Sequence, residues 1–203
     1  KLVKAGLRVA ICDQLEDPKT VKGIVKRGVT ELVTPGVALQ DEVLSSKSNN
    51  FLMAVHEGNK SFGIALLDVS TGEFLVSEGQ EDQVAKIIQS FRPSEVIYQK
   101  RVKYNFSDVK SKFLLDDWAS QYDFAVDKLT NLFKTKNLKG FGIEDLKEGI
   151  ISAGAILAYL DDTHHFEIRH ITSIQRLNQD LFVWMDPFTI RNLELVYSPH
   201  PKG

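Results

Sequence analysis

Short apolar runs separated by turn residues occupy the stretch between residues 51 and 80. Two of them, 51–57 and 62–69, flank a polar turn, and a third begins at Phe74 after a Ser-Thr-Gly turn. Runs rich in valine, isoleucine and leucine that are joined by tight turns are typical of hairpinned strands. The pattern therefore predicts three consecutive antiparallel strands.

The period of the pattern then changes. Apolar residues between 84 and 91 recur with the spacing of one helical face, Pro93 ends that helix, and a strand follows at 95–98. Two further stripes predict helices. The first starts at Asp116 and Asp117, whose charges suit a helix N-terminus, and the second spans 144–159, where small residues allow close packing. Strands and helices in this order predict an α/β fold with a mixed sheet covered by helices.

Breaks in the pattern predict four segments. Residues 1–37 contain a helical turn closed by Gly6, then a strand at 8–12, a basic loop and a second strand that ends at Thr34-Pro35-Gly36. A serine- and asparagine-rich linker at 38–50 precedes the main domain, 51–165, and residues 166–203 lead into a helix that starts at Asp186. Because both ends lie beside helix signals, we expect the chain to be part of a longer protein.

Composition narrows the setting. The 203 residues are 43% hydrophobic, and 25 basic against 27 acidic side chains give a net charge of -2, so any contact with nucleic acid must come from a local patch. The single cysteine, Cys12, lies in an apolar run and is predicted to be a small buried residue in a reducing, cytoplasmic compartment. No apolar stretch reaches the roughly 20 residues that span a membrane.

No complete catalytic, metal or nucleotide motif is present. The string Gly58-Asn-Lys-Ser resembles the end of a phosphate-binding loop but lacks the upstream glycine. His164, His165 and His170 invite a metal interpretation, yet structural zinc sites need four ligands, so an exposed helix end is the favoured interpretation.

Asp68 raises an alternative. It ends a predicted central strand, and two-metal nucleases gather several acids at such a place, with Asp116, Asp117 and Asp145 as further candidates. However, an aspartate before Ser-Thr-Gly also caps a turn by accepting backbone amides. The capping role is favoured, and a metal-dependent nuclease remains the alternative.

A basic patch is the remaining candidate for a binding site. Its members are Lys19, Lys22, Lys26 and Arg27, with no acid among them. Such a cluster is either a solvated loop or a contact for DNA phosphates, which require only well-placed cations.

Four segments, in order, resemble the MutS family of DNA mismatch repair proteins. They are VAICDQLEDP from Val9, VTPG from Val33, GIALLDVSTGEF from Gly63 and MDPFTIRNLEL from Met185. The resemblance implies that residues 1–37 end a mismatch-recognition domain, that 51–165 form a ribonuclease-H-like connector domain, and that the tail begins a lever domain.

The resemblance also implies a function. The parent would be a dimeric ATPase that binds mismatched duplex DNA and uses ATP and Mg²⁺ at a site outside this chain. The segment itself would be non-catalytic, would hold no cofactor, and would relay between the DNA-binding and ATPase ends while docking a MutL-like repair protein. The basic patch would then contact the DNA backbone.

Overall fold

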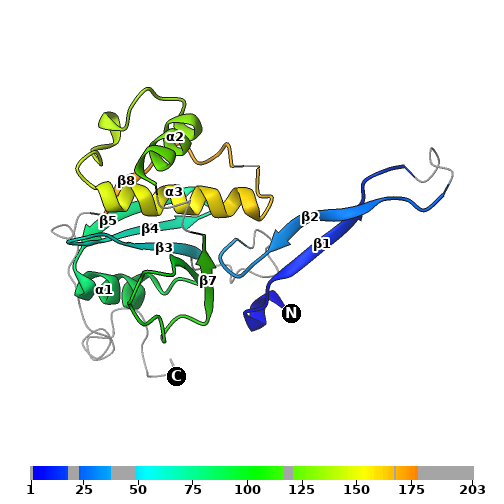
Figure 1. Ribbon diagram of the computed structural model, residues 1–203, viewed down its shortest axis with the longest axis horizontal. Helices are drawn as coiled ribbons and strands as arrows, with labels where there is room; N and C mark the ends of the chain where they lie inside the picture. The colour runs from blue at the N-terminus through cyan, green and yellow to red at the C-terminus, as the bar shows by residue number, and fades with distance from the viewer. Residues whose placement is uncertain (1, 18–22, 38–48, 117–120, 167, 178–203) are drawn as a thin grey trace, which may run out of the picture.

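The computed structural model describes residues 2–17, 23–37, 49–116, 121–166 and 168–177 (Figure 1). Its elements, in chain order, are η1 (Val3–Ala5), β1 (Val9–Gln14), β2 (Arg27–Val33), β3 (Phe51–Glu57), β4 (Phe62–Asp68), β5 (Glu73–Gly79), α1 (Glu81–Phe91), β6 (Glu95–Gln99), β7 (Ser111–Leu115), α2 (Tyr122–Phe133), η3 (Lys139–Phe141), α3 (Lys147–Asp162) and β8 (Gln175–Arg176). Among these residues, no helix is both long and apolar enough to cross a membrane. The predicted helix from Asp186 lies outside the described residues.

Six strands form one mixed sheet in the order β7-β6-β3-β4-β5-β8. β3, β4 and β5 pair antiparallel, which confirms the three predicted hairpinned strands. β6 runs parallel to β3, and β7 runs parallel to β6. We call the sheet, its helices and the loops between them, residues 49–177, the body.

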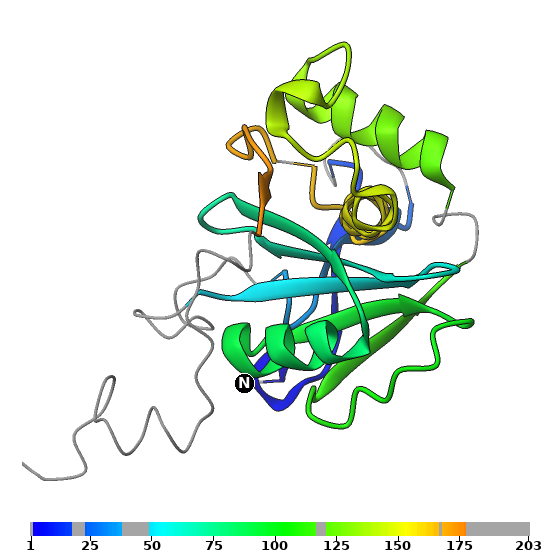
Figure 2. The ribbon, with the colours of Figure 1, turned by 90° about the vertical axis from the view of Figure 1, so that its left-hand side faces the viewer.

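Helices cover both faces of this sheet (Figure 1). Along each strand successive side chains point to opposite faces, so one set packs with α1 in one apolar cluster and the other set packs with α3 in a second. α2 lies on the far side of α3, as the end-on view of α3 makes clear (Figure 2). The body therefore has four layers: α1, the sheet, α3 and α2.

α3 is buried on nearly every side because it lies between the sheet and α2. Its small residues permit this, as the sequence predicted: a Cβ at Gly154 would come within 2.4 Å of the Ala125 Cβ on α2. On the other side, a Cβ at Gly63 of β4 would come within 1.9 Å of the Glu148 carbonyl oxygen. Glycine at both positions lets two backbones approach more closely than any side chain allows.

β1 and β2 form a separate two-stranded antiparallel sheet, here called the ribbon, which projects from the body (Figure 1). Gly6 precedes it, with φ 85° and its N–H donating to the Val3 carbonyl, which confirms its predicted capping role. Along most of the ribbon the side chains on both faces are exposed or only half-buried. The prediction of a buried Cys12 is therefore wrong: the thiol is exposed, because no apolar layer of the described residues covers that part of the ribbon.

The structure departs from the predicted elements in three further places. Ser111–Leu115 forms the unpredicted strand β7, so Asp116 follows a strand and does not start a helix; α2 begins at Tyr122. Asp117 lies outside the described residues. Beyond residue 165 the chain still packs on the sheet, since β8 pairs with β5 and Leu177 is buried.

Candidate functional site

The described part of the basic patch lies at the tip of the ribbon. Lys26 and Arg27 are exposed there, whereas Lys19 and Lys22 lie outside the described residues. The Lys26 ammonium is 3.8 Å from Glu16 Oε1, and its backbone N–H donates to Glu16 Oε2 at 3.2 Å. One cation of the patch therefore already has an acidic neighbour.

Strand pairing explains why the sequence alone did not reveal Glu16 as a neighbour of Lys26. The ribbon brings the end of β1 beside the start of β2, where the Leu15 N–H donates to the Lys26 carbonyl at 2.9 Å. Asp13 and Glu16, which precede the patch in sequence, thus lie opposite it in space; Asp13 Oδ2 accepts a hydrogen bond from Thr30. The tip therefore carries charges of both signs.

Asp68 is committed to the turn after β4. Its carboxylate is 1% exposed and accepts hydrogen bonds from the Ser70 and Thr71 backbone amides, the Ser70 hydroxyl and the Asn50 backbone amide. The predicted capping role is confirmed. Asp145, a further nuclease candidate, is paired instead with Arg176 at 2.8 Å. Because Asp68 and Asp145 already have these partners, the nuclease alternative is not favoured. Across the described ranges, no three histidine, cysteine or carboxylate side chains meet as a metal site.

The exposed helix end that the sequence predicted is found at His164 but not at His165. His164 is exposed, whereas His165 is buried, with its Nδ1 3.0 Å from Thr163 Oγ1. His170 is exposed, and its Nε2 lies 2.6 Å from the Val69 carbonyl oxygen. The chain after α3 folds back onto the body, and this return buries His165, which a free helix end would expose.

Among the acids that the structure describes, Glu95, the first residue of β6, is the most completely buried, with 0% exposure. Its Oε2 accepts from the Thr34 hydroxyl at 2.5 Å and from the Gly36 backbone amide at 3.0 Å. Its Oε1 accepts from the Tyr159 hydroxyl at 2.9 Å and from the Ser111 hydroxyl at 3.3 Å. Burial, and then the charge of Glu95, raises the pKa of the Tyr159 phenol, which keeps it a hydrogen-bond donor.

These four donors come from different parts of the chain. Thr34 and Gly36 follow the ribbon, whereas Ser111 and Tyr159 belong to β7 and α3 of the body. We call residues 31–37, with the body side chains they contact, the joint. Gly36 lies so close to the sheet that a Cβ there would come within 2.8 Å of Leu52 Cδ1 and 2.9 Å of Glu95 Cβ.

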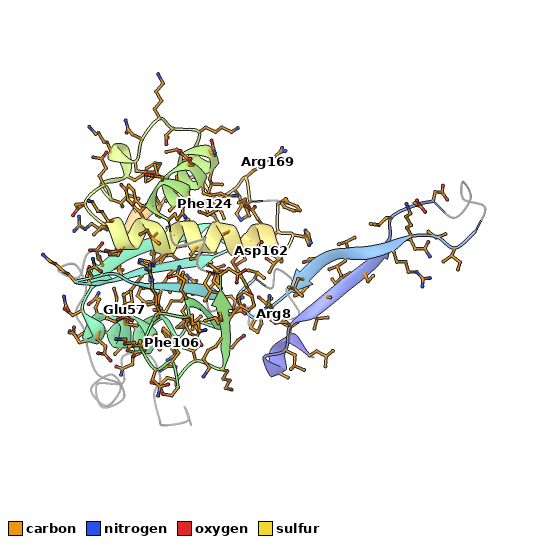
Figure 3. All side chains as sticks on the ribbon, viewed as in Figure 1. Arg8, Glu57, Phe106, Phe124, Asp162 and Arg169 are labelled. Atoms are coloured by element: carbon orange, nitrogen blue, oxygen red, sulfur yellow. The ribbon has the colours of Figure 1, made fainter. Side chains whose placement is uncertain are left out.

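Further contacts surround the joint. The Leu32 N–H donates to the Thr163 carbonyl at 3.1 Å, and Glu31 Oε1 lies 3.4 Å from His165 Nε2, which makes no hydrogen bond. The Arg8 guanidinium, at the base of the ribbon, stacks 3.9 Å from the centre of a β7 ring, that of Phe113 (Figure 3). The ribbon thus meets the body through hydrogen bonds, a contact between a carboxylate and an imidazole, and a cation–π contact.

A second polar cluster lies at the opposite end of the strands. His56 is 2% exposed, with Nδ1 2.8 Å from Gln99 Oε1 and Nε2 3.2 Å from Glu148 Oε2. Glu78 Oε2 accepts from the Glu148 backbone amide at 3.0 Å and so anchors the start of α3. Burial lowers the pKa of His56, and burial followed by the charge of Glu78 raises that of Glu148.

At the joint, four neutral donors hold the Glu95 carboxylate. These contacts give the carboxylate a structural role. The sequence pattern identifies Glu95 only as the start of a strand, so its role at the joint was not predicted. The available signal was an acid at the head of the apolar run Glu95–Gln99, since a charge that enters a buried strand needs partners.

Comparisons with known proteins agree with the resemblance of the four segments. The family model of MutS domain II matches residues 50–172, and that of MutS domain I matches residues 1–42. The DNA mismatch repair protein MutS of Flavobacterium johnsoniae is 60% identical over 207 residues, which cover 100% of this chain and 24% of that protein. The MutS of Christiangramia forsetii is 57% identical over 202 residues, covering 98% of this chain and 23% of that protein.

The chain thus spans about a quarter of the length of these curated relatives. Among solved structures, that of the Fowlpox virus resolvase with substrate Holliday junction DNA aligns with a TM-score of 0.38 and 12% identity, covering 55% of this chain and 97% of that one. This similarity is too low to support an argument. The domain matches and the identities of the relatives decide the question: the chain belongs to the MutS family of DNA mismatch repair proteins.

Proposed function

We propose that this chain is the non-catalytic connector segment of a mismatched-DNA-binding ATPase. The segment relays between the DNA-binding end and the ATPase end, and the body docks a MutL-like repair protein. The parent is a dimer that binds mismatched duplex DNA and uses ATP and Mg²⁺ at a site outside this chain. The observation that carries the proposal is the match of MutS domain II to most of the body.

The arrangement of the described residues supports a relay. A packed four-layer unit moves as a rigid body, so a displacement at one end changes the position of whatever is attached at the other. The acids in the body have structural partners: Asp68 caps a turn, Glu78 anchors α3 and Glu95 holds the joint. Each of these three carboxylates thus has a structural role, which supports the proposal of a relay.

We infer further that the body has a ribonuclease-H-like fold. Three antiparallel strands, β3, β4 and β5, are followed by β6 and β7 added in parallel beside β3, which is the strand arrangement of that fold. For the same chain we propose a mismatch-recognition part at 1–37, a linker at 38–50 and a lever domain toward the C-terminus. The body extends to Leu177 in this proposal, because β8 completes the sheet.

We propose that Lys19, Lys22, Lys26 and Arg27 contact the DNA backbone. The exposure of Lys26 and Arg27 at the tip of the projecting ribbon supports this, because phosphate contacts need accessible cations far from bulky surroundings. The nearby Glu16 and Asp13 keep the tip from being strongly basic. Binding by the chain alone is therefore expected to be weak and insensitive to mismatches.

Fluorescence anisotropy with labelled matched and mismatched duplexes at several salt concentrations tests the DNA contact. Weak binding that falls steeply with salt is expected, and Lys22→Glu with Arg27→Glu reduces both affinity and salt slope, because each lost phosphate contact lowers the slope by about one. Lys136→Glu with Lys139→Glu, at exposed positions of the body, is the matched control with the same change in net charge, and leaves both unchanged.

Two results would contradict the proposal. Equal losses in the ribbon variant and in the control with Lys136→Glu and Lys139→Glu would mean that binding follows net charge and not the patch. ATP hydrolysis that copurifies with the homogeneous chain and persists after both charge reversals would place an active site inside it.

A further inference from the structure

The described residues on either side of the segment 38–48 pack against the body. On one side of it Val37 is 1% exposed and packs in the apolar cluster beneath α3. On the other side, the Asn50 side-chain amide donates to the Pro35 carbonyl at 2.9 Å, and the Ser94 hydroxyl donates to Asn50 Oδ1 at 2.5 Å. Both ends of the segment are therefore fixed to the body and, through Asn50 and Pro35, to each other.

The chain before the segment is fixed more firmly still. Thr34 and Glu95 are each 0% exposed, and the carboxylate accepts four hydrogen bonds, two of them from residues 34–36. Hydrogen bonds to a buried charged group are stronger than those between neutral groups. Separating the ribbon from the body would remove the two that residues 34–36 donate to this buried carboxylate.

A second group of contacts prevents rotation about this point. Glu95 lies at the start of β6, whereas the Leu32 N–H bonds to Thr163 at the C-terminal end of α3, and Arg8 stacks on Phe113 of β7. Contacts to three different elements of the body define an orientation as well as a position. A single contact would leave the ribbon free to swing.

We propose that the buried Glu95 carboxylate locks the ribbon to the body, so that the two turn as one lever and the segment 38–48 is not the hinge between them. Glu95 is thus a positioning residue, which acts through the ribbon and touches no ligand. The inference goes beyond the proposed function and does not depend on it, because it concerns the geometry of the chain without DNA or nucleotide.

Spin labels placed on the ribbon and the body test the lock. Cys12 is the chain's single cysteine and is exposed on β1, so it takes one label directly. Ser90→Cys, at an exposed position of α1, takes the other. Double electron–electron resonance on the full chain is expected to give one narrow distance, and a Gly-Ser insertion within 38–48 leaves it narrow.

Two variants disrupt the contact between ribbon and body, one at Glu95 of the body and one at Gly36, which follows the ribbon. Glu95→Leu removes all four acceptor contacts, and Gly36→Val places a branched side chain where a Cβ alone would already touch Leu52 and Glu95. Each is expected to replace the narrow distance with a broad one. Glu95→Gln largely preserves it, because the amide oxygen still accepts from Thr34 and Gly36 while its NH₂ group donates to the hydroxyls.

Glu78→Leu is the matched control, since it removes an acceptor of backbone amides at the opposite end of the strands. It lowers the stability of the body but leaves the distance narrow. Gly36→Val lies outside the sheet and the helices, so it tests the lock even where Glu95→Leu fails to fold. A broad distance in the unaltered chain, a broadening by the insertion, or a narrow distance in folded Gly36→Val would overturn the proposal.

Discussion

The ribbon and the body are both built on antiparallel strands, yet they hold their shape by different means. β3 and β4 are almost entirely buried, because helices lie on both faces of their sheet. β1 and β2 have similar hydrogen-bonded pairing, but Leu15 is 61% exposed and Val29 50% exposed. Strand pairing alone is therefore not what distinguishes them.

The difference shows where the stability of a strand pair comes from. An isolated two-stranded hairpin is at best marginally stable in water, and burial of apolar side chains supplies most of what a larger sheet gains. Within the described residues, the ribbon has little such burial. The contacts between the base of the ribbon and the body therefore contribute most of its stability. The same substitution should then lower the unfolding free energy by different amounts in the two regions.

Leucine truncation gives the largest expected contrast. Leu129 of α2 is 0% exposed, so Leu129→Ala removes buried methyl groups and leaves a cavity that costs about 3 kcal/mol of unfolding free energy. Leu15→Ala at the ribbon tip should stay within about 0.5 kcal/mol. Urea denaturation followed by circular dichroism measures both. Similar losses would mean that the ribbon has an apolar core of its own.

Glycine replacement gives a smaller contrast with the same logic. Gly63→Ala forces a methyl group against the Glu148 backbone of α3, which cannot give way without moving the helix, and should cost about 2 kcal/mol. Gly28→Ala in the ribbon meets only the Leu15 side chain, at 2.9 Å, which can rotate into solvent. Thermal unfolding of the two variants should separate them clearly, and a destabilising Gly28→Ala would contradict the view of an open ribbon.

A pH dependence gives the smallest effect and concerns the joint itself. Burial lowers the pKa of His165 below its ordinary value of 6.5, against the opposing charge of Glu31. The unfolded chain therefore binds this proton first, so the stability contributed by the neutral side chain is lost as pH falls below 6.5. His165→Gln should reduce the loss of unfolding free energy between about pH 7.5 and about pH 5.5.

His56→Gln provides the matching measurement at the far end of the strands, since burial lowers its pKa as well. Each replacement should remove part of the acid sensitivity, and the two should act additively because the sites share no partner. An unchanged pH dependence in the His165 variant would mean that this side chain is accessible to protons in the folded chain.

Local pattern was enough to predict most of the body. The apolar runs at β3 and β4 and the helical spacing of α1 were recognised because burial on known faces imposes a period on the sequence. β7 was not predicted because the polarity of its residues does not follow their burial: in this short edge strand the polar Ser111 is buried and the apolar Leu114 is exposed. The chain reaches it from β6 through a loop, without the helix that usually announces a parallel strand.

The features that depend on distant residues could not be predicted in the same way. Glu95 finds Thr34 and Tyr159 far away along the chain, and no local rule names partners at such separations. The neighbour of Lys26 was missed for a related reason, since only the pairing of β1 with β2 brings Glu16 beside it. The predicted burial of Cys12 was wrong because an apolar run is buried only where another layer covers it.

The order of the layers also has a consequence for synthesis on the ribosome. β3, β4 and β5 leave the exit tunnel together and can pair at once, but α3 and β8, which cover one face and one edge of them, are made later. Until residue 177 has emerged, the nascent sheet presents an uncovered apolar face and an unpaired edge strand, β5. This interval is when the chain is most exposed to misassociation and most in need of chaperone protection.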